Sequence, residues 1–256
     1  MRIKTVQWNI GGGKIRKRND DPHARDVYLH DGLDHMVGIL KKIQPNIIAI
    51  QENHENKRFN FAREIARALD LKYLVSDVYD KSHLEEGLGL GQAIISEFPL
   101  KNHTFVKFYN PKLEIIGPDG KKWIMHNKGL TSATVNLDKN CVLHLMTLHL
   151  MPFRRFGLDP KGTNTKKVWQ DLQKKLGNAP DYLLLQGDFN LNFQRIKRFI
   201  PKFFENGVSE VVQKPATAPK NRRYDHVLYK GLKLISSKVE NKALTDHYPI
   251  FSEFEI

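Results

Sequence analysis

The sequence has one cysteine in 256 residues, Cys141, and fewer acidic than basic side chains. A single cysteine excludes a disulfide within the chain, and its place in an apolar strand pattern predicts a buried structural thiol. No run approaches the roughly 18 consecutive apolar residues of a membrane-spanning helix. The chain enters a strand pattern at Ile3 without the apolar segment of a signal peptide. We therefore expect a cytoplasmic protein, in a compartment where thiols stay reduced.

Signs of a domain boundary are also missing, since the chain has no Gly/Ser-rich or proline-rich linker, no low-complexity tract and no internal repeat. Apolar residues make up 40% of the chain and aromatic residues 10%, which is enough for a substantial core. A chain of this length holds either one large domain or two small ones. We predict a single domain over residues 1–256.

Positive charge is in excess, with 41 Lys and Arg against 28 Asp and Glu and a formal net charge of +13. Such an excess favours a polyanionic partner, such as nucleic acid or anionic lipid headgroups. A basic surface that serves only solubility explains the same number, because net charge does not show where the charges lie. Basic clusters at 14–18, 154–155, 194–198 and 220–223 favour nucleic acid if they surround one site. Nothing in the sequence implies an obligate protein partner.

The short apolar run Leu183–Leu185 predicts a strand that is buried on both faces and too short to be a helix. It stops at Gly187, and Asp188 and Asn190 follow at once. In extended backbone, residues two apart point the same way, so we expect this carboxylate and this amide to share one site. Such a pair suits hydrolysis, although a strand followed by an Asx-turn explains the same residues.

The rest of the chain alternates between strand patterns and a few amphipathic helices. Helices are predicted near residues 30–44, 59–70, 163–176 and 193–205. Further strands are predicted near residues 3–9, 47–50, 72–78, 91–96, 103–108, 130–137, 141–149, 224–229 and 232–239, and from 250 onward. Helices in the middle of each half, separated by many strands, indicate two stacked sheets with helices outside. A glycine-rich loop at 11–13 lacks the Gly-Lys-Ser/Thr that follows in a P-loop.

Polar residues follow many of these strands. They are Asn9, Glu52, His149, Asp188 with Asn190, Asp225, and Asp246 with His247. Some have ordinary alternatives, because Glu52 can cap an element, His149 can be a hydrogen-bonded core histidine and Asp225 can be a turn residue. Together they offer oxygen ligands for a hard divalent cation and two imidazoles, without the cysteine ligands of a structural zinc site. Metal-assisted hydrolysis of a phosphoester uses this combination of groups.

Seven motifs of the chain resemble, in the same order, those of the endonuclease/exonuclease/phosphatase (DNase I-like) superfamily. They are Trp8-Asn9-Ile10, Gln51-Glu52, Gly91 to Ser96, Thr147 to Leu150, Gly187 to Asn190, Tyr224 to Val227 and Thr245 to Pro249. The resemblance implies an α+β fold, a four-layer α/β/β/α sandwich in which two mainly antiparallel sheets pack face to face with helices outside. It also implies a hydrolase that cleaves phosphate esters with Mg²⁺ or Mn²⁺.

The same resemblance implies roles for the acidic and amide residues. Glu52 would be the principal metal ligand, with Asn9 beside it and Asp246 near the metal. Asp188 would activate or orient the attacking water, and Asn190 would hydrogen-bond the phosphoryl oxygens.

Two histidines complete the implied site. His247 would bind the phosphate and stabilise its charge, and Asp225 would fix the tautomer and orientation of that ring. His149 would lie opposite, as a phosphate binder or as the acid for the leaving group. These roles agree with the physical expectation that a carboxylate partner orients an imidazole and raises its pKa.

The branch of the superfamily stays open. Gly11 stands where abasic-site endonucleases and tyrosyl-DNA phosphodiesterases carry Asp, two residues after the first-strand Asn. The Asn-Lys-Gly run around Lys128 resembles the inositol-phosphatase and sphingomyelinase branches, where this Lys lies near the phosphate. However, a His follows Asp225 where the inositol phosphatases have Arg. The approach to Asp225, including Arg223, resembles small bacterial-type members. We expect Lys128 and Arg223 to bind substrate.

Three hypotheses follow from these residues. The first is a metal-dependent phosphodiesterase that acts on DNA or RNA as an endonuclease or exonuclease. The second is a phosphatase or phosphodiesterase of inositol phosphates or phospholipid headgroups, motivated by Lys128. The third is a non-catalytic binding protein that kept the fold, and the complete set of metal, water and histidine positions argues against it.

Overall fold

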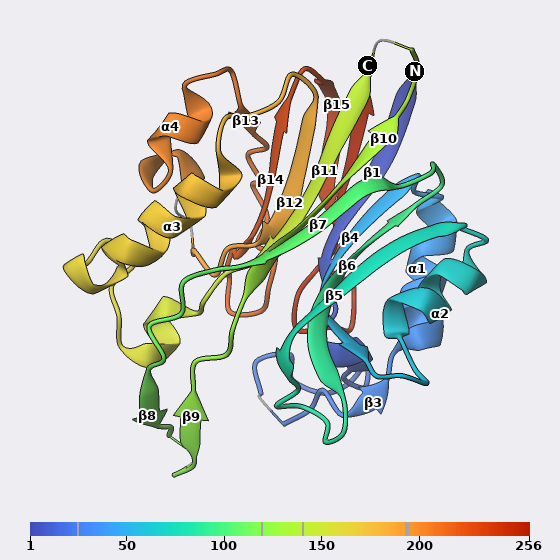
Figure 1. Cartoon of the computed structure of the whole chain (residues 1–256). Helices are drawn as coiled ribbons and strands as arrows, with labels where there is room; N and C mark the ends of the chain where they lie inside the picture. The colour runs from blue at the N-terminus through green and yellow to red at the C-terminus, as the bar shows by residue number, and fades with distance from the viewer. Residues whose placement is uncertain (25, 119, 140, 193–194) are drawn as a thin grey trace.

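The computed structural model describes residues 1–24, 26–118, 120–139, 141–192 and 195–256. Two six-stranded sheets pack against each other, and Figure 1 shows helices covering the outer face of each. The first sheet has the order β15 (Lys233–Val239), β16 (Ile250–Glu255), β1 (Arg2–Asn9), β4 (Ile47–Glu55), β6 (Gly89–Ser96) and β5 (Tyr73–Lys81). The second has the order β13 (Ser209–Glu210), β14 (Asp225–Lys230), β12 (Leu183–Asp188), β11 (Val142–His149), β10 (Gly129–Asn136) and β7 (Lys101–Lys107).

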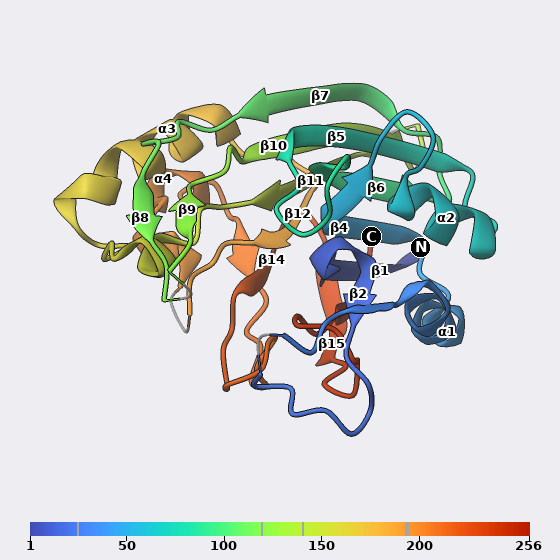
Figure 2. The ribbon, with the colours of Figure 1, turned by 90° about the horizontal axis from the view of Figure 1, so that it is seen from below.

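The predicted fold class is confirmed. The pairs β1–β4 and β11–β12 are parallel, and the other described neighbours within the two sheets are antiparallel. Helices α1 (Leu33–Ile43) and α2 (Phe61–Ala68) cover the first sheet, and α3 (Lys166–Leu176) and α4 (Pro201–Phe204) cover the second, as the turned view in Figure 2 also shows. No helix among the described residues has both the length and the apolar character needed to span a membrane.

Helix α1 illustrates how local sequence sets these elements. Met36 and Leu40, four residues apart, are buried against the sheet, as expected for one face of a helix. The helix ends at Gln44, whose φ of 53° is left-handed, and Pro45 follows. A residue in this conformation ends a helix, and proline cannot continue one, so β4 starts directly afterwards.

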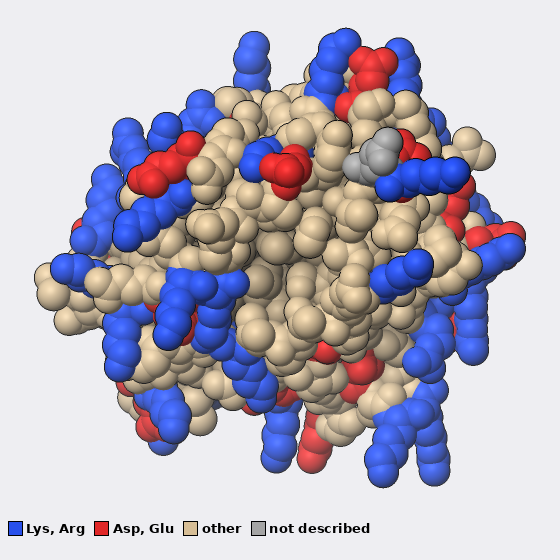
Figure 3. All heavy atoms as spheres, turned by 45° about the horizontal axis from the view of Figure 1, so that its top comes forward, with Lys and Arg blue, Asp and Glu red and all other residues tan. Residues whose placement is uncertain are grey.

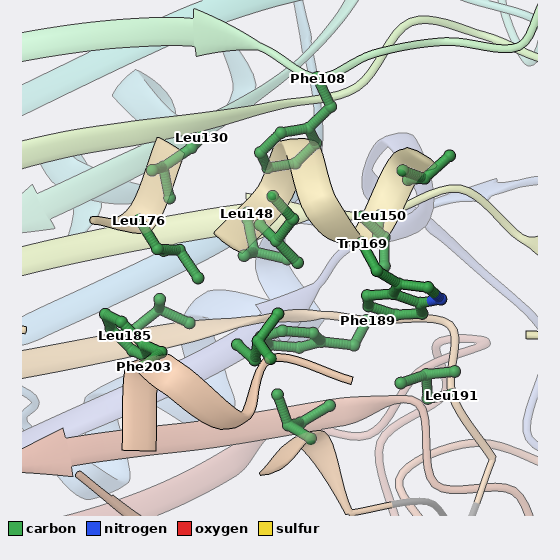
Figure 4. Close-up of a cluster of buried hydrophobic side chains, with 14 of the residues drawn as sticks. Phe108, Leu130, Leu148, Leu150, Trp169, Leu176, Leu185, Phe189, Leu191 and Phe203 are labelled. Atoms are coloured by element: carbon green, nitrogen blue, oxygen red, sulfur yellow. The ribbon is translucent and has the colours of Figure 1, made fainter. Parts of the chain in front are cut away.

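The strand β12 is buried on both faces, as its apolar run predicts. Leu185 packs with Phe189, Trp169 and Phe203 in a cluster between the second sheet and helices α3 and α4, shown in Figure 4. Leu184 points the other way, into the core between the two sheets. The strand therefore has no solvated face, and its polar end at Asp188 is held by packing on both sides.

Some elements differ from the expectation. The helical stretch predicted near 193–205 is present in the described part of that range only as two short pieces, a 3₁₀ turn (Ile196–Arg198) and α4; residues 193–194 lie outside the described residues. Pro201 cannot donate a helical hydrogen bond, so it sits at the first position of α4 and separates the two pieces. The hairpins β2 (Lys14–Ile15) with β3 (His30–Asp31) and β8 (Glu114–Ile116) with β9 (Lys122–Ile124) were not predicted.

Strand register brings the polar strand ends together. His149 at the end of β11 lies beside Asp188 at the end of β12, and Asp188 lies opposite Asp225 at the start of β14. In the other sheet, Asn9 at the end of β1 pairs with Gln51 of β4. Both chain termini lie at the opposite end of the sandwich in Figure 1. The sequence signal of a polar group after each strand thus becomes one cluster.

Candidate active site

The carboxylate of Asp188 lies at the centre of the cluster and is 1% exposed. Its Oδ2 accepts a hydrogen bond of 3.0 Å from Asn9 Nδ2, and its Oδ1 accepts one of 2.8 Å from the backbone N–H of Asn190. Burial raises the pKa of Asp188 to about 7, against the opposing charge of His247. A carboxylate with this pKa exchanges a proton near neutral pH, as a general base must.

A second carboxylate orients a histidine on one side of Asp188. Asp225 Oδ2 lies 2.9 Å from His247 Nδ1, so the ring carries its proton on that nitrogen, and Nε2 faces Asp188 Oδ2 at 3.8 Å. The other oxygen of Asp225 accepts from Gln7 Nε2 at 3.2 Å. Burial alone would lower the pKa of His247, but Asp225 and Asp188 raise it well above its ordinary value. His247 is therefore a cation at neutral pH.

The second histidine, His149, lies on the other side of Asp188 in a different environment. Its Nε2 lies 3.5 Å from Asp188 Oδ2 and 3.8 Å from Glu52 Oε1, and its Nδ1 lies 2.9 Å from Lys128 Nζ and 3.1 Å from Tyr79 Oη. Burial, reinforced by the positive charge of Lys128, holds the pKa of His149 well below its ordinary value. The two imidazoles of the cluster therefore differ in charge at neutral pH, with His149 neutral and His247 positively charged.

Lys128 lies close to both ring nitrogens of His149, with Nζ 2.9 Å from Nδ1 and 3.2 Å from Nε2. An ammonium group only donates, so it can donate to whichever nitrogen of the neutral ring carries no proton. Nε2 faces the carboxylates of Asp188 and Glu52. Lys128 is itself 5% exposed, and burial lowers its pKa to about 8 despite the opposing carboxylates. It remains a cation at pH 7.

Glu52 occupies a β-bulge in β4, where the pairing with β6 shifts between Gln51 and Asn53. Its φ is 54°, which is unusual for a residue with a side chain. A bulge redirects one side chain out of the strand alternation, and here it turns the carboxylate toward His149. Burial alone would raise the pKa of Glu52, but His149 and Lys128 lower it, to about 2. Glu52 is therefore an anion at any pH at which the protein works.

Asp246 supplies an oxygen without a partner. Its Oδ1 is buried and accepts no hydrogen bond among the described residues. Burial raises the pKa of Asp246 to about 6, and the negative charge of Glu52 adds to this effect. A buried acceptor left unpaired beside a second carboxylate is costly, and a hard cation bound to both would remove the cost. The residues that fit Mg²⁺ or Mn²⁺ are thus Glu52, Asp246 and the amide oxygen of Asn9.

A second group of residues has the composition of a metal site. Ligand atoms of Asp188, Asp225 and His247 lie within 4.8 Å of one another. These atoms are already engaged with each other, with Asn9 and with Gln7. A cation at this group would have to break this network, whereas Glu52 and Asp246 could hold one without doing so.

Gly11 explains why the chain lacks the Asp expected there in two branches of the superfamily. Its φ is 53°, its N–H donates to Asn9 Oδ1 at 3.0 Å, and a Cβ at this position would lie 2.6 Å from Asp246 Oδ1. The space that a side chain would need is therefore filled by Asp246.

Gly11→Asp is expected to destabilise the protein by about 1–3 kcal/mol from backbone strain, with a further loss from crowding of Asp246. Chemical denaturation measures the change in the free energy of unfolding. Gly38→Ala is the matched control, since Gly38 lies in α1 with no atom near its Cβ position, and it should be neutral or stabilising by about 0.5–1 kcal/mol. A Gly11→Asp variant as stable as the wild type would contradict this account.

Two predicted site residues make other contacts. Asn190 donates from Nδ2 to the carbonyl of Leu150 at 2.8 Å, which leaves one amide hydrogen for a substrate oxygen. Arg223 donates to the carbonyls of Lys214 and Pro215. Its role in substrate binding stays a prediction.

Tyr79 and Gln7 are site residues that sequence reasoning missed. Tyr79 is 1% exposed and bonds His149, while Gln7 joins Asp225 to Gln51. Both stand inside strands, not at their ends, so the pattern of polar strand ends does not include them. The nearest signal in the sequence was the Gln51-Glu52 motif, because Gln51 bonds Gln7.

Two packed sheets with this cluster at one edge define the DNase I-like class of fold. The chain belongs to the Endonuclease/Exonuclease/phosphatase family, whose model matches residues 6–247. No curated protein matches the chain.

Solved structures of the family resemble the fold at low sequence identity. An endonuclease/exonuclease/phosphatase from Beutenbergia cavernae DSM 12333 is 15% identical with a TM-score of 0.72, over 100% of this chain and 72% of that one. The human Nocturnin catalytic domain with bound sulfate anion is 17% identical with a TM-score of 0.65, over 99% and 94%. D. rerio TDP2 complexed with single strand DNA product is 14% identical with a TM-score of 0.65, over 100% and 99%.

Proposed function

We propose that this chain is a divalent-metal-dependent phosphodiesterase that cleaves nucleic acid. The observation that carries the proposal is the buried carboxylate of Asp188 between two imidazoles, with His149 Nε2 at 3.5 Å and His247 Nε2 at 3.8 Å from its Oδ2. A general base and a fixed cation around one small space suit attack of water on a phosphate diester. The cation at Glu52 and Asp246 would supply charge neutralisation at the phosphate when bound.

Each residue then has one task. Asp188 takes a proton from the attacking water, since its pKa near 7 keeps a large fraction ionised at neutral pH. His247, oriented by Asp225, donates from Nε2 to a phosphoryl oxygen and stabilises the charge that develops there. The N–H of neutral His149 donates to another oxygen. The P–O bond to the leaving group breaks as the water oxygen bonds to phosphorus, and the leaving oxygen takes a proton from solvent. A neutral imidazole is a weak acid, so binding phosphate suits His149 better than protonating the leaving group.

An activity panel tests the proposed substrate class. Supercoiled plasmid, single-stranded DNA, RNA, inositol phosphates and sphingomyelin should be incubated with Mg²⁺ and with Mn²⁺. We expect cleavage of at least one nucleic acid, in line with the family membership and the net charge of +13. Turnover of inositol phosphates or sphingomyelin alone would overturn the nuclease assignment and leave the phosphodiester chemistry standing.

A second candidate substrate is a small phosphate ester or lipid headgroup. Lys128 favours it, because a buried ammonium against His149 offers one strong point charge at the scissile phosphate and needs no polymer beyond it. Lys128→Ala should then reduce turnover of a small substrate far more than it weakens nucleic-acid binding.

The pH profile tests Lys128 directly. Burial lowers its pKa to about 8 from an ordinary value above 10, so the charge is present below that pH and is lost as the pH rises through it. We expect kcat/KM to fall above about pH 8. Lys128→Arg keeps its charge at higher pH and should move this limb upward, whereas Lys128→Met should lower kcat/KM throughout. An unchanged alkaline limb in Lys128→Arg would assign it to another group.

A further inference from the structure

We propose that a groove over α3, separate from the candidate active site, binds a single-stranded segment of the nucleic-acid substrate; the inference rests on the proposed function. The groove has a volume of about 460 Å³ and forms where the loop before α3 meets the segment leading into α4. Its aromatic and basic lining residues are Lys161, Lys166, Trp169, Arg198, Phe199 and Lys202. None of them belongs to the cluster around Asp188.

The floor of the groove is a cluster of aromatic rings that are tilted against one another. Trp169 packs between Phe153 and Phe199, with ring centroids 5.3 Å and 4.5 Å apart, and its Nε1–H donates to the carbonyl of Pro160 at 2.8 Å. Trp169 is 6% exposed, whereas Phe199 is partly exposed. Phe199 therefore offers a ring held in place from behind, and nucleobases stack on such rings with little dependence on sequence.

The rim of the groove is positive. Lys161, Lys166, Arg198 and Lys202 are exposed, and no ion pair joins any of them to another described residue. No acidic side chain is among the described residues that line the groove. In Figure 3, Lys and Arg dominate the side of the molecule that α3 and α4 cover in Figure 1. Cations around an aromatic surface match a strand of phosphates and bases.

The basic cluster at 14–18 fits this role less well. Arg16 donates to the carbonyls of Lys17, Arg18 and Asp20, so its guanidinium holds its own loop. Lys14 pairs with Glu85 at 3.0 Å. The rim of the groove thus combines uncommitted cations with an aromatic ring.

The groove is within reach of the cluster. Arg198 follows Asp188 by ten residues, which span at most about 35 Å. One strand of a duplex advances about 3.4 Å per nucleotide, so a strand of roughly ten nucleotides or more can occupy both places. KM should therefore fall as substrates lengthen to about this size.

The charge test uses a labelled single strand of about 20 nucleotides, with fluorescence anisotropy recorded in EDTA over a range of salt concentrations. Lys161→Gln/Lys166→Gln should bind more weakly, with a salt slope smaller by about 0.7 per lost phosphate contact. Lys41→Gln/Lys42→Gln removes the same charge from exposed positions of α1 and should keep the wild-type slope.

The stacking test uses Phe199→Leu, which keeps apolar packing and removes the ring. The wild type should bind a strand with bases at least about tenfold more tightly than an abasic strand, and Phe199→Leu should lose most of this preference. Thermal unfolding shows whether Phe199→Leu is folded. If it is not folded, the charge variants decide the question, together with hydrogen exchange on the wild type. In that measurement, bound oligonucleotide should protect the peptides that flank Phe199.

The outcomes separate this inference from the proposed function. Groove variants that bind like the α1 control would overturn the inference even if the chain cleaves nucleic acid. Groove-dependent binding without cleavage would support the inference and count against the proposed function. The inference would also be overturned if Lys161→Gln/Lys166→Gln binds the single strand normally but loses binding to phosphatidylserine vesicles. That result would identify the groove as a membrane-binding surface.

Discussion

Asp188→Asn is expected to lower kcat by roughly 10² to 10⁴, which is the contribution typical of a general base. The amide keeps the shape of the side chain but cannot take the proton of the attacking water. Both oxygens of Asp188 accept hydrogen bonds, from Asn9 Nδ2 and from the N–H of Asn190. The amide of the variant has only one oxygen, so one of these two hydrogen bonds is lost. Steady-state kinetics on a nucleic acid and on bis(p-nitrophenyl) phosphate measure the effect, and thermal unfolding shows that the variant is folded.

His247→Ala should cause a loss of similar size, because it removes the cation that faces the phosphate. Asp225→Asn is expected to act on catalysis mainly through that ring, since Oδ2 lies 2.9 Å from His247 Nδ1, while its other oxygen accepts from Gln7. The double variant Asp225→Asn/His247→Ala should therefore be no worse than His247→Ala alone. Fully additive losses would show that Asp225 acts elsewhere. A wild-type kcat in Asp188→Asn would contradict the role of Asp188 as general base.

Removal of the metal is expected to abolish activity. EDTA should stop turnover by the wild type, and added Mg²⁺ or Mn²⁺ should restore it. Glu52→Gln should weaken Mn²⁺ binding at least about 100-fold, because it removes the charge that a hard cation requires and keeps the size of the side chain. Isothermal titration calorimetry measures binding of the metal without depending on catalysis.

Glu64→Gln is the matched control for Glu52→Gln. Glu64 lies on α2, where its carboxylate pairs with Arg67 at 3.1 Å, and its replacement should leave Mn²⁺ affinity unchanged. Asp246→Asn should reduce the affinity as well, since its unpartnered Oδ1 is the second proposed ligand. Full activity in EDTA would refute the metal mechanism, and wild-type Mn²⁺ affinity in Glu52→Gln would move the cation to another set of ligands.

The sequence by itself determined two stacked sheets with helices outside and most of the polar residues of the site. Apolar runs of strand length, each followed by a polar residue, predict strands whose ends carry chemistry, because strand alternation and burial are local properties. Asp188 after Leu183–Leu185 and His149 after its own strand follow this rule, and the register then places them side by side. The helical stretch predicted near 193–205 is divided into two short pieces, because Pro201 cannot donate a helical hydrogen bond.

Only the tertiary structure decided the contacts, charge states and side-chain directions of these residues. The neutral state of His149 and the charged state of His247 come from burial against Lys128 and from contact with Asp225, which are partners distant in the chain. A bulge with left-handed backbone aims Glu52, and packing between segments assembles the groove around Phe199. Charge state, side-chain direction and cavities depend on which segments meet in space, so the sequence pattern could not supply them.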